Sequence, residues 1–188
     1  MRVSADSPGA FLSLVRILDA GGIAIAPGDT MYGMIGVAPE SEALLRRVKG
    51  RGEDKPFLVL IADASWASRI SDRPVPARLV RFWPGPLTMI FPDRFGGTTA
   101  MRVPDSAFLR DLVRALGKPL CSTSVNKAGS PPIQTIQEMV REFEKDVDII
   151  YDDGDHPPGE PSTLVDISAR PYRIVRQGAL RLSPMDLE

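Results

Sequence analysis

Several residue types are scarce in this chain of 188 residues, and each scarcity excludes a class of protein. One His and one Cys rule out a disulfide framework and any zinc site built from His and Cys within one chain. A histidine-based catalytic triad would have to use His156, which we expect to be a loop residue. No apolar run approaches the roughly 20 residues of a membrane span, and no signal-peptide pattern opens the chain. We therefore expect a cytoplasmic protein with Cys121 reduced.

Net charge is nearly absent too. The chain has 23 Lys and Arg against 24 Asp and Glu, a formal net charge of −1. No overall positive field would draw it to nucleic acid or to an anionic membrane, so any anion site must be local. Apolar residues make up 43% and charged residues 25%, close to globular averages. At roughly 100 to 200 residues per domain, the length predicts one domain covering residues 1–188.

Apolar periodicity predicts an α/β (α+β) fold in which helices flank one large mixed sheet. Ser7 and Pro8 predict the start of a first helix, and Thr135 with Glu138 predicts a capping box on a later one. Predicted strands cover residues 23–26, 57–62, 87–91, 101–103, 119–121, 147–151, 163–167 and 172–175.

The two commonest nucleotide motifs are missing. The chain has neither a Gly-x-x-x-x-Gly-Lys-Ser/Thr phosphate loop nor a Gly-x-Gly-x-x-Gly fingerprint, so a nucleotide site would need another design. The first candidate segment runs from Pro27 to Gly33 and contains Thr30 and Tyr32; it is also typical of an ordinary strand-to-loop turn.

A second candidate is the basic segment at residues 46–55, whose glycines allow a close backbone approach to an anion. Arg46 and Arg47 are better explained by a solvated helix end, so Lys49, Arg51 and Lys55 are the stronger candidates. The third candidate, Ser122 to Asn126, is expected on a loop after a strand and is also typical of turn capping.

The last candidates are strand-end residues, which in many proteins are simply at the surface. They are Ser162 with its neighbours, Thr98, Arg102 and Arg176.

Taken in order, these segments resemble the YrdC-like threonylcarbamoyl-AMP synthase family. Residues 27–33, Pro-Gly-Asp-Thr-Met-Tyr-Gly, are similar to the family's Pro-Thr-Glu-Thr-x-Tyr-Gly. Lys49-Gly50-Arg51 and Ser124-Val125-Asn126 are similar to its Lys-x-Arg and Ser-x-Asn. Further similar phrases occur at residues 82–88, 102–104, 162–166 and 175–178, so the resemblance covers nearly the whole chain. Departures from the family pattern are Gly28, Gly52, Leu60 and Val125.

The resemblance implies a short, single-domain YrdC-like fold, with a strongly curved mixed sheet, flanking helices and a positively charged concave cavity. It implies that L-threonine, bicarbonate and ATP give threonylcarbamoyl-AMP and pyrophosphate, for threonylcarbamoyladenosine (t6A) modification of tRNA. The implied partners are these small molecules, with tRNA or proteins of the t6A pathway as possible further ones, and no membrane.

The resemblance also implies residue roles. Catalysis is assigned to Lys49, Arg51, Ser124 and Asn126. ATP would be surrounded by Lys49, Arg51, Lys55, Thr98, Ser122, Asn126, Pro132 and Arg176. Threonine would be held by Thr30, Tyr32, Arg102, Ser124 and Ser162, with Arg102 pairing its carboxylate. Magnesium would travel with ATP, held by phosphate and water, so no protein metal site is expected.

The implied chemistry suits a chain with one His and one Cys. The amine of threonine can take up CO2 unaided, and the carbamate then attacks the α-phosphorus, so the protein mainly positions anions and stabilises charge on phosphate. Two alternatives remain: a paralogue that uses another amino acid, to which the departures at Gly28 and Leu60 point, and a non-catalytic RNA-binding module with salt-dependent affinity.

Overall fold

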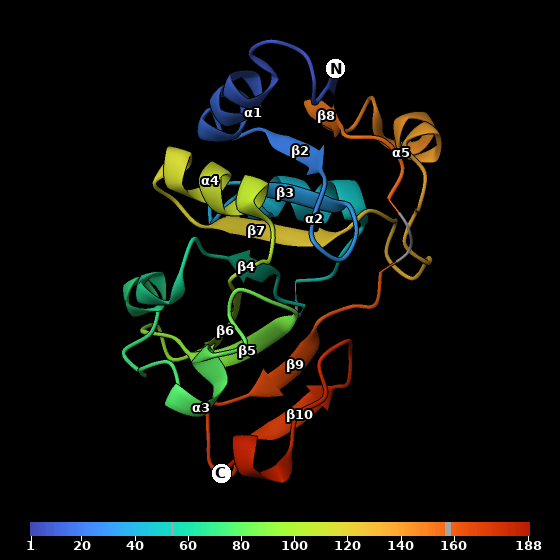
Figure 1. Ribbon diagram of the computed structural model, residues 1–188. Helices are drawn as coiled ribbons and strands as arrows, with labels where there is room; N and C mark the ends of the chain where they lie inside the picture. The colour runs from blue at the N-terminus through green and yellow to red at the C-terminus, as the bar shows by residue number, and fades with distance from the viewer. Residues whose placement is uncertain (54, 157–158) are drawn as a thin grey trace.

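One mixed sheet of ten strands organises the described structure, a computed structural model that covers residues 1–53, 55–156 and 159–188. The strand order is β1-β8-β2-β3-β7-β4-β6-β5-β9-β10, and the sheet curves along the length of the molecule (Figure 1). The strands are β1 (Arg2–Ser4), β2 (Ile23–Ala26), β3 (Gly33–Val37), β4 (Leu58–Leu60), β5 (Leu87–Pro92), β6 (Thr98–Arg102), β7 (Leu120–Ser124), β8 (Ile149–Asp152), β9 (Thr163–Asp166) and β10 (Arg173–Arg176). The α/β fold with one large mixed sheet is therefore confirmed.

Strand β3 lies near the middle of the sheet although no strand was predicted there. Its two glycines weaken the strand signal. Gly36 is required by packing, because a Cβ atom at this position would lie 2.5 Å from Cβ of Ser41, at the start of the next helix. Strand β1 was also missed, since three residues are too few for a clear alternating pattern.

Helices cover both faces of the sheet. They are α1 (Ala10–Asp19), α2 (Glu42–Lys49), α3 (Ala77–Val80), α4 (Ala107–Leu116) and α5 (Ile136–Phe143), with 3-10 turns η1 (Ala64–Arg69) and η2 (Pro184–Asp186). The predicted helix start at Ser7 is wrong: Ser7 and Pro8 lie in a turn, and α1 begins after Gly9, whose φ of 79° is unfavourable for other residues. The cap of α5 is confirmed, since the Thr135 hydroxyl accepts from the Glu138 N–H.

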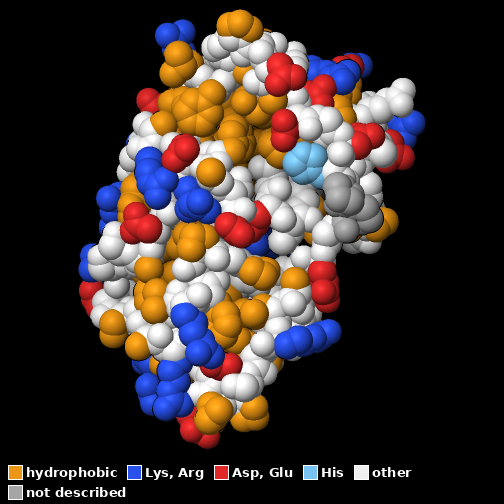
Figure 2. All heavy atoms as spheres, viewed as in Figure 1, with side chains coloured by type: hydrophobic (Ala, Val, Ile, Leu, Met, Phe, Trp, Pro, Cys, Tyr) orange, Lys and Arg blue, Asp and Glu red, His pale blue; other side chains and the backbone are white. Residues whose placement is uncertain are grey.

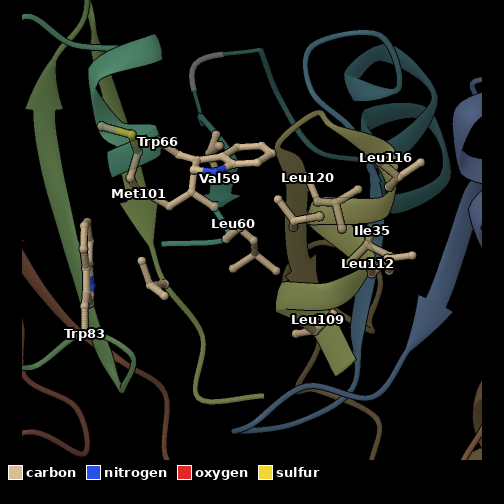
Figure 3. Packing of buried hydrophobic residues seen from close by; sticks show 14 of the residues in the cluster. Ile35, Val59, Leu60, Trp66, Trp83, Met101, Leu109, Leu112, Leu116 and Leu120 are labelled. Atoms are coloured by element: carbon tan, nitrogen blue, oxygen red, sulfur yellow. The ribbon is translucent and has the colours of Figure 1, made fainter. Parts of the chain in front are cut away.

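Alternating side chains divide the core into two clusters, one on each face of the sheet. Along β2, Ile23 and Ile25 belong to one cluster, whereas Ala24 and Ala26 belong to the other. The cluster on the isoleucine face includes residues of α2 and α5. The other includes α4, whose apolar residues lie beside strands β3 and β7 (Figure 3). Because α2 is packed into the core, its last residue is held at a defined place beside the sheet.

Candidate functional site

Lys49 forms the centre of a buried polar cluster at the end of β7. It is the last residue of α2, and it is only 3% exposed. Its ammonium group donates to Ser124 O at 2.7 Å, to Asn126 O at 3.2 Å and to the Asn126 side-chain oxygen Oδ1. The Ser124 hydroxyl donates to the same Oδ1 at 2.7 Å. The structure thus brings together three of the four residues predicted to be catalytic.

The charge of Lys49 is sensitive to its surroundings. Burial, which disfavours a charged amine, and the nearby Arg51 charge lower the pKa of Lys49 to about 8. An ordinary lysine would stay fully charged at pH 8, whereas Lys49 can change its charge close to neutral pH. An incoming anion would restore the charged form.

Arg51, the fourth predicted catalytic residue, shapes the loop that follows α2. It donates to Lys55 O at 3.1 Å and to Pro56 O at 2.9 Å, and its guanidinium lies 5.2 Å from the centre of the Phe57 ring. Arg46 contacts the same ring at 4.9 Å and donates to Lys55 O at 3.0 Å. Arg46 therefore organises this loop, which goes beyond the solvated helix end that its position suggested.

Ser122 and Ser124 belong to β7, so the prediction that residues 122–126 form a loop is wrong for its first half. The strand continues because its backbone pairs with β3, where Ser124 lies opposite Gly33. A Cβ atom at Gly33 would lie 3.1 Å from the Ser122 hydroxyl oxygen. The chain after Asn126 folds back, with the Asn126 amide donating to Ser130 O and the Ile133 N–H donating to Val125 O at 2.8 Å, so Pro132 lies one residue from a contact with this strand end.

A second buried group surrounds Arg102 at the end of β6. Arg102 is 4% exposed; its Nη2 lies 2.6 Å from Asp29 Oδ2, and its Nε donates to Gly85 O at 2.9 Å. Burial lowers the pKa of Arg102, and Asp29 opposes that effect. The Asp105 N–H donates to the same Asp29 oxygen at 2.7 Å. The sequence prediction missed Asp29, although an acidic residue at the third position of the 27–33 motif was a signal for it.

Ser162 and Arg176 adjoin this second group. The Ser162 hydroxyl lies 2.8 Å from that of Thr88, another buried residue that sequence reasoning missed. Arg176 donates to Ser162 O at 2.9 Å, and its charge contributes to lowering the pKa of Arg102. A cavity of about 280 Å³ lies alongside. Its lining residues are Asp29, Thr30, Pro86, Asp105, Gly159, Glu160 and Ala179.

Tyr32 is tied to the segment after β8. Its hydroxyl donates to Gly154 O and accepts from the Asp153 N–H, both at 2.9 Å. Its ring centre lies 4.9 Å from that of His156, the pale blue side chain in Figure 2. Burial is the largest of the effects that raise the pKa of Tyr32 to about 12. The hydroxyl is thus neutral and engaged with backbone.

The β2–β3 loop connects the two buried groups, because it carries Asp29 to Arg102 and ends at Gly33, opposite Ser124. The two remaining predicted residues are peripheral. Thr98 is exposed at the start of β6, and Lys55 is exposed ahead of β4, which runs parallel to β6.

Within the described ranges, no group of three or more His, Cys, Asp and Glu side chains could hold a metal ion. No helix among those residues is long and apolar enough to cross a membrane.

The curved mixed sheet places the chain among α/β proteins with a YrdC-like fold. The model of the Sua5/YciO/YrdC family, described as "Telomere recombination", matches residues 16–178. The chain belongs to this family.

Curated relatives carry the name threonylcarbamoyl-AMP synthase. The one from Bos taurus is 31% identical over an alignment that covers 90% of this chain and 68% of the relative. The one from Pyrococcus abyssi is 29% identical over 85% of this chain, and the match spans 51%, about half, of that relative.

Solved structures agree on the fold. Sua5 of P. abyssi, crystallised with L-threonine, has a TM-score of 0.84 at 23% identity, covering 95% of this chain and 57% of that one. YciO of E. coli has a TM-score of 0.82 at 24% identity, covering 98% of this chain and 97% of that one. At these identities the likeness shows the fold alone.

Proposed function

We propose that this protein forms threonylcarbamoyl-AMP and pyrophosphate from L-threonine, bicarbonate and ATP, for t6A modification of tRNA. The observation that carries the proposal is the buried Lys49–Ser124–Asn126 cluster, built from the Lys-x-Arg and Ser-x-Asn segments in direct contact. The curated relatives named threonylcarbamoyl-AMP synthase support it. We propose further that residues 1–188 act as one domain, in the cytoplasm where tRNA and the proteins that consume this product are found.

In this proposal the two buried groups bind the two substrates. The Lys49 cluster, with Arg51, faces the phosphates of ATP, and the positive charges of Lys49 and Arg51 stabilise negative charge as the α-phosphorus is attacked. Arg102 and Ser162 hold threonine, with the carboxylate on the guanidinium. Bicarbonate dehydrates to CO2 and hydroxide, the neutral threonine amine adds to the CO2, and its proton passes to the hydroxide, giving a carbamate and water. A carbamate oxygen then bonds to the α-phosphorus as the bond to the pyrophosphate oxygen breaks.

Magnesium would enter on the nucleotide. The Lys49 cluster offers an ammonium group, a hydroxyl and an amide, which suit phosphate oxygens better than a metal ion. Phosphate oxygens and water would therefore supply the Mg²⁺ ligands, and the ion would neutralise charge on the leaving pyrophosphate.

A second candidate is the same reaction with another amino acid. A Cβ atom at Gly28 would lie 2.5 Å from Met31 O, so the tight β2–β3 loop has no room there for the threonine that the family pattern carries. Leu60 is 3% exposed and packs in the core, so its position offers no polar group to a substrate. Gly28 precedes Asp29, and Leu60 lies opposite Arg102 in the β4–β6 pair, so both departures are next to the group proposed to hold the amino acid.

One experiment separates the candidates. The protein is incubated with ATP, labelled bicarbonate and each of a panel of amino acids, and pyrophosphate and the labelled adenylate are measured. Release that depends on threonine supports the first proposal, and release with a different amino acid supports the second. No release with any amino acid, where a known synthase is active, overturns both. Salt-dependent RNA binding that ATP does not displace would then favour the RNA-binding module.

A further inference from the structure

Arg102 is held along one edge only. An arginine has five N–H donors in a planar fork, and Nε with one proton of Nη2 forms its side edge. In Arg102 this side edge is filled, because Nε donates to Gly85 O and Nη2 donates to Asp29 Oδ2. Nη1 has no hydrogen-bond partner among the described residues. The end edge, formed by Nη1 and the second proton of Nη2, is thus open to a ligand.

The open edge is accessible to solvent. The Arg102 side chain is 5% exposed, and within the described part of the chain no fully buried side-chain nitrogen or oxygen lacks a partner. Nη1 lacks a partner, so Nη1 must be among the exposed atoms. Asp29 also lines the cavity of about 280 Å³, which is large enough for an amino acid. A small molecule in this cavity therefore lies close to the Arg102–Asp29 pair.

Asp29 is itself firmly placed. Its Oδ2 accepts from Arg102 Nη2 at 2.6 Å and from the Asp105 N–H at 2.7 Å, and its side chain is only 11% exposed. These contacts join the β2–β3 loop to the turn after β6. Asp29 provides the nearby negative charge that Arg102 needs, because Arg176 adds a second positive charge in this region.

We propose that Asp29 is the positioning residue for Arg102. Together with Gly85 O it fixes the side edge of the guanidinium, which leaves the end edge, beside the cavity that Asp29 lines, to receive the substrate carboxylate by two parallel hydrogen bonds. In this role Asp29 acts through Arg102 and makes no hydrogen bond of its own to the substrate carboxylate. This inference rests on the proposed function, and it assigns a role in amino-acid binding to a residue whose own charge would repel a carboxylate.

The test compares Asp29→Ala with Asp29→Asn. Alanine removes the acceptor for Nη2, whereas asparagine keeps an oxygen in the same place and loses only the charge. Asp111→Asn is the matched control, because Asp111 pairs on the surface with Arg114 at 2.9 Å. For each variant the KM values for threonine and ATP, kcat and calorimetric threonine binding are measured. Thermal unfolding shows which variants fold, and Asp29→Ser, whose hydroxyl is too short to reach Nη2, replaces an alanine variant that does not.

We expect Asp29→Ala to raise the KM for threonine about ten- to a hundredfold, the cost of a misplaced binding group, with the KM for ATP unchanged. Asp29→Asn should recover most of this loss, and Asp111→Asn should equal the wild type. An unchanged threonine KM in Asp29→Ala overturns the inference. A lowered one also overturns it, because Asp29 would then compete with the substrate for Arg102. A wild-type protein that neither binds nor turns over threonine overturns the proposed function instead, before any variant is compared.

Discussion

Binding of ATP should load a proton onto Lys49. With a pKa of about 8, Lys49 is neutral in about half of the molecules at pH 8. Phosphate groups beside it would favour the charged form, as an opposite charge within a few Å raises the pKa of an amine. If the pKa in the complex reaches 10 or more, each ATP bound takes up about 0.5 proton at pH 8 and about 0.1 proton at pH 7.

The sign follows from linkage. Because the complex binds more protons than the free protein between these two pKa values, ATP affinity must fall as the pH rises above 8. The limiting slope is about tenfold per pH unit. Below pH 7 the free protein already carries the proton, and the affinity should be nearly independent of this group.

Titration calorimetry measures this uptake directly. ATP is titrated at pH 8 in two buffers that differ in their ionisation enthalpy, and the difference in heat gives the number of protons taken up. Lys49→Arg is the matched variant, since a guanidinium stays charged in both states and should remove the uptake. Equal uptake by the wild type and Lys49→Arg would refute the placement of Lys49 beside the phosphates. ATP affinity that does not change between pH 7 and 9 would do the same.

Three further changes test the loop that follows α2, the β2–β3 loop and the core. Arg51→Ala should abolish pyrophosphate release while the melting temperature stays close to that of the wild type, because an ion pair or loop contact near the surface contributes only about 1 kcal/mol or less. The control variant Arg47→Ala, on the exposed side of α2, should stay active. Full turnover in Arg51→Ala would exclude a phosphate role for Arg51. Gly159→Ala should raise the KM for threonine more than the KM for ATP, because the added Cβ would lie 1.8 Å from Thr30 O and displace the β2–β3 loop. An unchanged ratio of the two KM values in steady-state kinetics would contradict this. Phe143→Ala removes a fully buried ring and should lower the free energy of unfolding by about 3 to 5 kcal/mol in denaturant titrations, and a loss below about 1 kcal/mol would show that α5 contributes little to the core.

Helix and strand types were predictable where one local pattern dominated. Residues 23–26 form a strand as expected, because a short apolar run with turn residues at its end has few other solutions. Strand β3 was missed because its glycines are selected by close packing, and only the fold shows that Gly36 lies against Ser41. The β7 strand extends through Ser124 because β3 and β4 offer backbone partners, which a propensity argument cannot include.

The residues of the candidate site were also only partly predictable from the sequence. The residue types made Lys49 and the segment 122–126 candidates, and the family resemblance assigned catalysis to Lys49, Ser124 and Asn126. The resemblance also pointed to Arg102, through a short motif that survives at low overall identity.

Amino-acid composition alone sets the scarcity of His and Cys and the near-zero net charge. The order of the residues sets the polar segments from which a site could be built. The tertiary structure decided how these residues are used. It buries Lys49 against Asn126, 77 residues later in the chain, and so lowers the pKa of its amine. It also pairs Asp29 with Arg102, 73 residues away. Burial and pairing depend on which segments fold side by side, and long-range contacts of this kind leave no local pattern in the sequence.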